Sequence, residues 1–311
     1  MIKILIIDIG SNSVRMNLLN IDPCGGFKII NDIKEPVRLA AGMDSENRIS
    51  EEYINKAIHT LRSYKRLADS VEADNIIAVA TEAVRKASNK EHFVQRVKQD
   101  AGLDIQILSG AEEAYYDYFA ARSSIDFEDG LIMDIGGAST ELALVKNREL
   151  VNSISIPYGS VNLTQMFDTT EKLTSQQETT LKFFLYEQLK KITWLENSNP
   201  KYLIGIGGTI RNIAEIDRIR KNYPLDITHN YHMATDDIHA IFENARTKDL
   251  TQRNKIPGLS KTRADIFLAP CAFAAILCDY CGIKDILISG SGLREGLIYS
   301  YLATQGIHVV K

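Results

Sequence analysis

Cysteine is scarce in this chain of 311 residues, which has only Cys24, Cys271, Cys278 and Cys281. So few cysteines, three of them close together late in the sequence, exclude a disulfide framework. Cys278 and Cys281 form a single Cys-x-x-Cys pair, with no second pair to complete a zinc site. Cys271 and Cys278 lie one heptad apart in a helix-like apolar run, so we expect buried thiols, with a zinc or redox role as the alternative.

Long apolar runs and an excess of positive charge are also absent. The longest apolar run, residues 267–278, contains Pro270 and is too short to cross a bilayer. No signal-peptide pattern precedes the first apolar run, so we expect a cytoplasmic protein. The net charge of −4 argues against binding nucleic acid or a membrane over the whole surface. A locally basic cleft could still take an anionic substrate.

What the chain does have is a series of apolar runs and helical patterns that starts twice. Residues 2–7 predict a strand buried on both faces, followed by a meander, and residues 131–135 begin the same pattern again. An α/β series that restarts once at this length predicts two similar domains, 1–124 and 125–311. The last helix could pack back on the first domain. Two such domains commonly leave a ligand cleft between them. The expected strands are 2–7, 14–19, 27–33, 75–80, 105–108, 131–135, 141–145, 150–156, 202–206 and 284–289. The expected helices are 50–67, 82–86, 93–101, 111–122, 175–195, 209–219 and 293–302.

Glycine-containing turns follow several of the expected strands. They are DIGSNS at 8–13, DIGGAST at 134–140, GIGGT at 205–209 and SGSG at 289–292. Glycine lets backbone N–H groups approach a phosphate closely, and serine and threonine add hydroxyl donors. No turn matches a Walker A loop or a GxGxxG fingerprint. The alternative for any single one of these segments is an ordinary tight turn. Two such turns in matching positions favour phosphate binding.

Carboxylates accompany the first two turns. Asp8 and Asp134 each end the strand that leads into a turn, where a carboxylate repels phosphate unless it holds a divalent cation such as Mg²⁺. Glu141 begins the next strand, so Asp134 and Glu141 can both face the mouth of the turn. Two carboxylates around one Mg²⁺ recur in phosphate chemistry. The alternative is that Glu141 is a solvated edge residue.

Two corners between a strand and a helix carry further candidates. Ser109 and Glu112 have capping-box spacing, which leaves Glu113 in the first helical turn, able to deprotonate a water. The alternative is an ordinary acidic residue favoured by the helix N-terminus. Thr81 can cap a second helix, and Arg85 in its first turn suits a bound phosphate, with an ordinary surface arginine as the alternative. Further cationic candidates near glycine turns are Arg211, Arg263 and Arg294, and a structural role is the favoured interpretation of each.

Together these residues resemble the exopolyphosphatase / guanosine pentaphosphate phosphohydrolase (Ppx/GppA) family of the actin-like ATPase superfamily. Seven blocks carry the resemblance in family order: IDIGSNSVRMNLL, ATEAVRKASN, ILSGAEEA, MDIGGASTEL, GIGGTIRNIA, PGLSKTRADI and SGSGLREGLIY. The resemblance implies two ribonuclease-H-like domains with the active site in the cleft between them. It also implies Mg²⁺-dependent hydrolysis of a terminal phosphoanhydride, and we expect a homodimer.

The resemblance also implies roles for individual residues. Glu113 is the base that activates water, and Asp134 and Glu141 are the carboxylates that hold metal and orient water. Asp8 is a further candidate metal ligand. Phosphate contacts are implied for Arg85 and for the residues of three turns: Ser11, Asn12, Ser13, Gly136, Gly137, Ala138, Ser139, Gly207, Gly208 and Thr209.

Two departures from the family pattern bear on the substrate. Ala138 stands where the family usually has glycine, so a methyl group could narrow the approach of phosphate. Long family members carry an additional helical region after the second domain, whereas this chain ends at Lys311. We therefore expect short polyphosphate or a nucleotide rather than processive action on long chains.

We interpret the protein as an exopolyphosphatase that releases orthophosphate from the end of inorganic polyphosphate. Guanosine pentaphosphate is the close alternative substrate, and an ATP-dependent kinase or a nucleotide-sensing regulator on the same fold is the more distant one. Only the second acidic turn is followed by an acid, Glu141, and Val14 is taken as its counterpart after the first. We therefore assign phosphate positioning mainly to the first turn, and metal and water chemistry mainly to the second.

Overall fold

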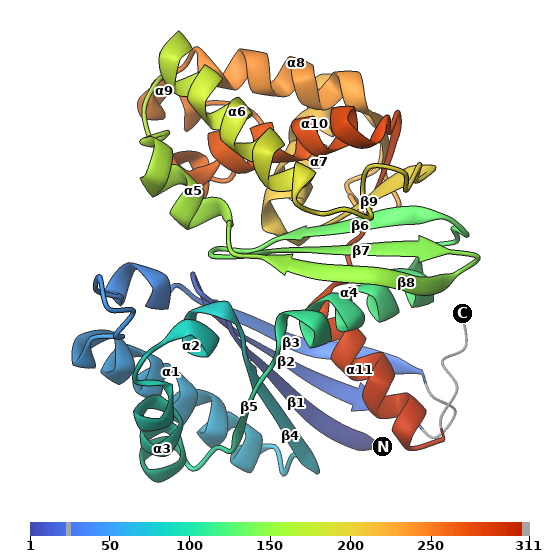
Figure 1. Ribbon diagram of the computed structural model, residues 1–311. Coiled ribbons are helices and arrows are strands. Elements are labelled where there is room, and N and C mark those ends of the chain that lie inside the picture. The colour runs from blue at the N-terminus through green and yellow to red at the C-terminus, as the bar shows by residue number, and fades with distance from the viewer. Residues whose placement is uncertain (23–25, 307–311) are drawn as a thin grey trace. The chain divides into compact units, whose positions relative to one another are not determined.

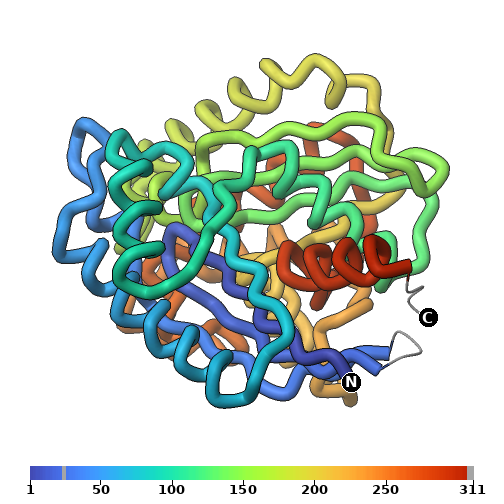
Figure 2. Tube along the Cα trace, turned by 90° about the horizontal axis from the view of Figure 1, so that it is seen from below, coloured from blue at the N-terminus to red at the C-terminus, as the bar shows by residue number. Residues whose placement is uncertain are grey.

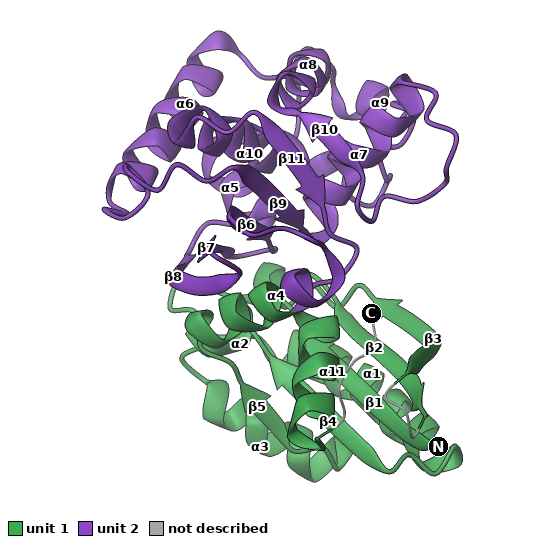
Figure 3. Cartoon of the chain, turned by 90° about the vertical axis from the view of Figure 1, so that its right-hand side faces the viewer, with its two compact units in different colours: residues 1–119, 293–311 green, residues 120–292 purple. Residues whose placement is uncertain are grey.

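The computed structural model describes residues 1–22 and 26–306 (Figure 1). The chain forms two compact units, Met1–Phe119 with Leu293–Lys311 and Ala120–Gly292 (Figure 3). The first passage of the chain between the units therefore lies after residue 119, inside a helix, whereas the sequence predicts a boundary after residue 124. The last helix, which the sequence assigned to the second domain, belongs to unit 1.

Unit 1 is built on a five-stranded sheet of order β3-β2-β1-β4-β5. The first three strands form an antiparallel meander, and β4 and β5 run parallel to β1. The strands are β1 (Ile2–Ile9), β2 (Val14–Ile21), β3 (Phe27–Glu35), β4 (Asn75–Ala80) and β5 (Ile105–Ile107). The helices are η1 (Leu39–Gly42), α1 (Glu51–Ser70), α2 (Glu82–Lys86), α3 (Lys90–Ala101), α4 (Gly110–Ser124), which continues into unit 2, and α11 (Leu293–Thr304).

The central strand β1 is buried on both faces because helices cover both. Side chains alternate along a strand, so Leu5 and Ile7 pack in one cluster with residues of α1 and α3. Ile4 and Ile6 pack in another with Leu302 and its neighbours on α11. Both views show α11, in red, beside the blue strands of unit 1 (Figure 1, Figure 2). The nearly continuous apolar run predicted this two-sided burial correctly.

Unit 2 is built on a six-stranded sheet of order β10-β11-β9-β6-β7-β8. Its strands are β6 (Gly130–Ile135), β7 (Thr140–Lys146), β8 (Glu149–Ile156), β9 (Tyr202–Ile206), β10 (His232–Ala234) and β11 (Asp285–Ile288). Its helices are α5 (Ser160–Phe167), α6 (Ser175–Lys190), α7 (Gly207–Arg220), α8 (Thr235–Arg246), α9 (Leu250–Arg253), η2 (Ala264–Ile266) and α10 (Leu268–Cys281). Helices α5, α8 and α9 were not expected from the sequence. Helix α7 begins at Gly207, so the two glycines expected in a turn lie in its first helical turn.

The two sheets repeat one topology. In each, a three-stranded antiparallel meander is followed by two strands parallel to its first strand, with β6, β7, β8, β9 and β11 taking the places of β1 to β5. Strand β10 adds an antiparallel edge to the second sheet. The expectation of two ribonuclease-H-like domains of the actin-like fold is confirmed.

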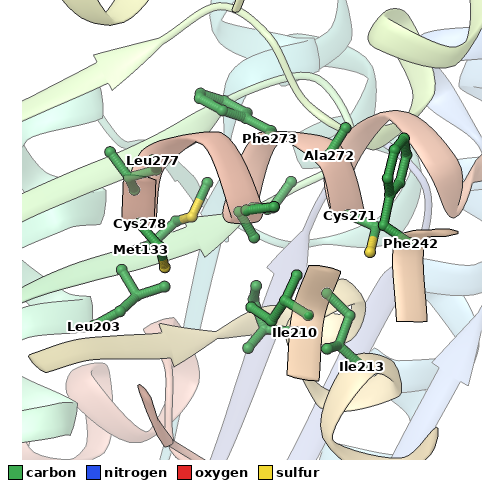
Figure 4. Packing of buried hydrophobic residues seen from close by; sticks show 14 of the residues in the cluster. Met133, Leu203, Ile210, Ile213, Phe242, Cys271, Ala272, Phe273, Leu277 and Cys278 are labelled. Carbon is green, nitrogen blue, oxygen red and sulfur yellow. The ribbon is translucent and has the colours of Figure 1, made fainter. Parts of the chain in front are cut away.

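The thiols of α10 belong to the core of unit 2. Cys271 and Cys278 lie in the same buried cluster as Met133, Leu203 and Ile213 (Figure 4). Burial raises the pKa of the Cys271 thiol and raises that of Cys278 to about 12. Both are free, as is Cys281, so the expected buried thiols are confirmed. Residue 24 lies outside the described residues. Across the described part of the chain, no helix combines the length and apolar character needed to cross a membrane.

Candidate functional site

The turn at residues 10–13, which follows β1, offers backbone donors. Its own closing hydrogen bond runs from the Gly10 N–H to the Ser13 carbonyl (3.1 Å). The carbonyls of Ser11 and Asn12 accept hydrogen bonds of 2.9 and 3.0 Å from the segment after β3. Within residues 1–22 and 26–306, the N–H groups of Ser11, Asn12 and Ser13 have no hydrogen-bond acceptor. Backbone N–H groups that have no acceptor within the protein can donate to water or to an anion.

The turn at residues 136–139, which follows β6, repeats this arrangement. The Gly136 N–H donates to the Ser139 carbonyl (2.9 Å), and the carbonyls of Gly136 and Gly137 accept from the start of α5 at 2.9 and 2.7 Å. The N–H groups of Gly137, Ala138 and Ser139 find no acceptor among the described residues. The duplicated turns therefore present matching sets of three donors, one set in each unit.

The methyl group of Ala138 does not strain its turn. Gly136, Gly137 and Ala138 all have φ values outside the left-handed region, so an L-residue is tolerated there. The crowded position is instead Gly159, where a Cβ atom would lie 2.7 Å from the amide nitrogen of Ala138. Gly159 therefore lets the start of α5 support the turn, a requirement that the sequence pattern alone does not indicate.

Two carboxylates meet beside the second turn. Asp134 and Glu141 are direct cross-strand partners on β6 and β7, and such partners project from the same face with Cβ atoms about 5 Å apart. Glu141 is 4% exposed and accepts a 2.7 Å hydrogen bond from the Ser155 hydroxyl. The Asp134 carboxylate lies against Gly207, in the space that a Cβ atom would fill. Glu141 is thus buried, and the interpretation of it as a solvated edge residue is wrong.

The first turn carries a different pair, which corrects the comparison of the two turns. Asp8 lies directly opposite Arg15 on β2, and Val14 lies opposite Ile9, as Thr140 lies opposite Ile135. Arg15, and not Val14, therefore occupies the place of Glu141. Burial raises the pKa of Asp8, and the charges of Arg294 and Arg15 offset only part of that shift.

The donor set beside the second turn fits Mg²⁺. In the described ranges, no group of three or more His, Cys, Asp and Glu side chains is arranged to hold a metal ion. Mg²⁺ is commonly bound by one or two carboxylates, with water and substrate phosphates completing its shell, so Asp134 and Glu141, which are direct partners on neighbouring strands, are a suitable pair. Asp8 faces a cation and is a weaker candidate.

The corner between β5 and α4 holds the candidate base. The Ser109 N–H donates to the Glu112 carboxylate (2.7 Å), and the Glu112 N–H donates to the Ser109 hydroxyl (3.2 Å), which confirms the expected capping box. These hydrogen bonds lower the pKa of Glu112. Glu113 follows in the first turn of α4, is 7% exposed, and accepts a hydrogen bond from Nη1 of Arg85.

Arg85 is the centre of a network of charges. Its Nη1 also donates to the Leu108 carbonyl (2.6 Å), and its Nη2 donates to Glu82, which also pairs with Lys86 (2.6 Å). Burial by itself lowers the pKa of Arg85, but the charges and hydrogen bonds of Glu113 and Glu82 outweigh it and raise the pKa. Arg85 is therefore no ordinary surface arginine.

The first turn of α7 is the third expected phosphate contact. Gly207 has φ +83°, and the Arg263 guanidinium packs against Gly208. Thr209 is 2% exposed, and the helix itself leaves the first N–H groups of α7 unpaired. Arg211 donates to the Gly207 carbonyl (3.2 Å). The phosphate contacts assigned to Gly207, Gly208 and Thr209 stay predictions, as do those of the other two turns.

The structure brings some of the expected residues together within each unit. Unit 1 joins Arg85 to Glu113, and unit 2 joins Asp134 to Glu141 and to Gly207. Arg294 is buried and pairs with Asn17 and Asp32 of unit 1, which agrees with its structural interpretation. The sequence carries a signal for three further residues of the site that were not expected. A constant offset between the two turns points to Arg15, spacing of three and four residues on a helix points to Glu82, and strand register points to Ser155.

Comparison with known proteins agrees with this geometry. The family model described as the Ppx/GppA phosphatase family matches residues 19–305. A bifunctional 3-dehydroquinate synthase/phosphatase of Fusobacterium nucleatum is 29% identical over 308 residues, which cover 94% of this chain and 45% of that protein. The chain thus spans about half the length of that curated relative.

Solved structures extend the comparison to the fold. The crystal structure of the Aquifex aeolicus member of the Ppx/GppA family is 29% identical, with a TM-score of 0.84 and 98% of each chain covered. An exopolyphosphatase from Cytophaga hutchinsonii has a TM-score of 0.89 at 24% identity, with 99% of this chain and 100% of that chain covered. At that identity the second likeness concerns the fold.

Proposed function

Because the chain belongs to the Ppx/GppA phosphatase family, we propose that it hydrolyses the terminal phosphoanhydride of inorganic polyphosphate and releases orthophosphate. The observation that carries the proposal is the buried carboxylate of Glu113 in the first turn of α4, next to Arg85. A carboxylate that a neighbouring cation holds in a fixed orientation can accept a proton from a water molecule placed beside it.

The proposed recognition of phosphate uses backbone donors. The unpaired N–H groups of residues 11–13, and likewise those of residues 137–139, are suited to the non-bridging oxygens of a phosphate group. Arg85 adds a positive charge at the terminal phosphoryl group. Phosphoryl transfer needs little covalent chemistry from the protein, so positioning and charge stabilisation supply most of the rate.

In the proposed reaction, Glu113 takes a proton from a water molecule as the water oxygen attacks the terminal phosphorus. The bridging P–O bond breaks, and its electron pair goes to the shortened polyphosphate. The products are orthophosphate and a chain shorter by one phosphate. Asp134 and Glu141 would hold Mg²⁺, which supplies positive charge to the phosphate oxygens when it is bound.

Guanosine pentaphosphate is the alternative substrate for the same site. It ends in a phosphoanhydride of the same kind, so the groups that act on the terminal phosphoryl are equally suited to both molecules. A homodimer and a cytoplasmic location remain expectations, which light scattering and fractionation would test.

A substrate panel tests the proposal. The protein is incubated with Mg²⁺ and with polyphosphates of graded length, guanosine pentaphosphate or ATP, and released orthophosphate is measured. We expect release from polyphosphate that disappears when EDTA removes the metal. Transfer from ATP to a small acceptor would favour a kinase, and no release from any of these compounds would refute hydrolysis.

A further inference from the structure

Glu82 is a buried carboxylate that the proposed reaction does not use. It begins α2 and is 4% exposed, although a carboxylate is costly to bury without partners. One oxygen accepts a hydrogen bond from Nη2 of Arg85, and the other lies 2.6 Å from Nζ of Lys86. Both partners come from the same short helix, at spacings of three and four residues. Glu82 therefore holds the side chain of Arg85 against the helix that carries both residues.

The contacts of Arg85 show what this attachment achieves. Its hydrogen bonds to Leu108, Glu113 and Glu82 use three of the five N–H donors of a guanidinium. The Nε–H and one Nη2–H have no acceptor in the part of the chain that the structure describes. Arg85 is thus held at both Nη atoms and still has donors left for an anion.

We propose that Glu82 is a positioning residue, which holds Arg85 so that this arginine orients Glu113 and keeps donors available for the terminal phosphoryl group. The inference rests on the proposed function, because it assigns Glu82 to the same site.

The alternative arrangement of Arg85 explains why a second carboxylate is needed. Arginine and a carboxylate favour a bidentate pair with two parallel hydrogen bonds. Without Glu82, Nη2 is released and can join Nη1 on Glu113. Such a pair would occupy both oxygens of the base and withdraw donors from the phosphate. Glu82 prevents it by engaging Nη2, and Lys86 balances the added negative charge.

The test compares Glu82→Ala with Glu82→Gln, in which the amide oxygen can still accept from Arg85. We expect Glu82→Ala to lower kcat for polyphosphate by about 10- to 100-fold, since small misplacements of catalytic groups have effects of this size. KM changes by less, about threefold, and Glu82→Gln recovers most of kcat. The matched control is Glu91→Gln, which removes an exposed glutamate at the start of α3.

The pH profile separates positioning from a merely structural role. Loss of a negative charge beside Arg85 leaves more positive charge near Glu113, so the acidic limb of kcat/KM moves to lower pH in both Glu82 variants. The control leaves this limb in place. A Glu82→Ala enzyme with kcat within twofold of the parent, or a Glu82→Gln profile that coincides with the control, would overturn the inference. If Glu82→Ala does not fold, Glu82→Gln decides the matter.

A second measurement keeps this test independent of the reaction. Carbon-13 labelled glutamate allows the carboxyl of Glu113 to be titrated by NMR, with its signal assigned by its loss in Glu113→Gln. We expect the midpoint to fall in Glu82→Gln and to stay unchanged in Glu91→Gln. If the parent releases no phosphate from any substrate, the proposed function fails, yet this titration still supports or refutes the contact of Glu82 with Arg85 and Glu113.

Discussion

Asp134 and Glu141 lie opposite each other on neighbouring strands, and the missing side chain of Gly207 leaves the space that the Asp134 carboxylate occupies. At the scale of single residues, the candidate site depends on glycines whose missing side chains leave room for neighbouring groups. Gly159 similarly permits α5 to approach the turn at residues 136–139. These glycines fix the position of groups that would bind metal or phosphate.

Gly207→Ala is expected to displace Asp134 and to reduce phosphate release at least tenfold. The added methyl group meets the Asp134 carboxylate, and the φ of +83° is unfavourable for alanine by about 1–2 kcal/mol. The matched control is Gly282→Ala, which has φ +68° but no atom within 4 Å of the added methyl. Phosphate release and thermal unfolding of both variants are compared. Equal losses in the two variants would show that Asp134 is not disturbed.

Residue-level prediction from the sequence succeeded where spacing alone fixes a geometry. The spacing of Ser109 and Glu112 predicted the capping box, and that assignment left Glu113 as the candidate base. It missed Arg15, although a constant offset between the two turns places this residue at the position of Glu141, and the strand register then pairs it with Asp8. Glu82 was missed because its burial results from tertiary packing.

At the scale of elements, the link between β11 and α11 is joined to α4 by one histidine. His229 accepts a hydrogen bond at Nδ1 from the Gly290 N–H (3.0 Å), and its Nε2 lies 3.2 Å from the Ser124 carbonyl. Since a carbonyl only accepts, Nε2 carries the proton in this arrangement. The chain passes between the units after residue 119 and again after residue 292. The ring of His229 thus connects the two segments of unit 2 that lie next to these crossings.

His229→Ala is expected to lower the free energy of unfolding by about 1–3 kcal/mol, because two backbone groups lose their partner. The change is measured by urea unfolding, and hydrogen exchange at the Gly290 amide should accelerate in parallel. His232→Ala is the control, since that ring is exposed and pairs with Asp285 at the surface. An unchanged exchange rate at Gly290 would contradict a connecting role for His229.

Among the elements, the buried strands were the easiest to predict. Strand β1 has helices on both faces, so its sequence is apolar throughout and unmistakable. The predicted start of α7 was wrong because glycine, as at Gly207 and Gly208, is unfavourable in the interior of a helix. At the first positions of a helix, this low helix propensity matters little. The edge strand β10 has three residues, too few for a pattern to show.

At the scale of the whole molecule, the chain is a duplication whose last element returns to its first unit. Leu302 of α11 is fully buried in the cluster that contains Ile4 and Ile6 of β1. The duplication could be predicted because the acidic turns recur after the same kind of strand. The packing of α11 on unit 1 was predicted only as an alternative, because an apolar helix does not reveal which sheet it will cover.

Leu302→Ala should therefore destabilise the N-terminal strands, although it lies near the other end of the sequence. We expect a loss of about 2–5 kcal/mol, the usual effect of removing a buried leucine side chain. Hydrogen exchange should accelerate in β1 and β4 and stay unchanged in β6 and β9. Leu189→Ala, a fully buried leucine of unit 2, should give the reverse pattern. Acceleration in β6 by the Leu302 variant alone would contradict the assignment of α11 to unit 1.

The central claim, that Glu113 activates the water that attacks the terminal phosphate, is tested most directly by Glu113→Gln. Orthophosphate release from polyphosphate with Mg²⁺ is measured together with binding of the same polyphosphate by calorimetry. The amide keeps the shape of the side chain but cannot take a proton, so we predict binding within about threefold of the parent and a loss of turnover of at least 100-fold. A variant that hydrolyses polyphosphate at the parental rate would contradict the account.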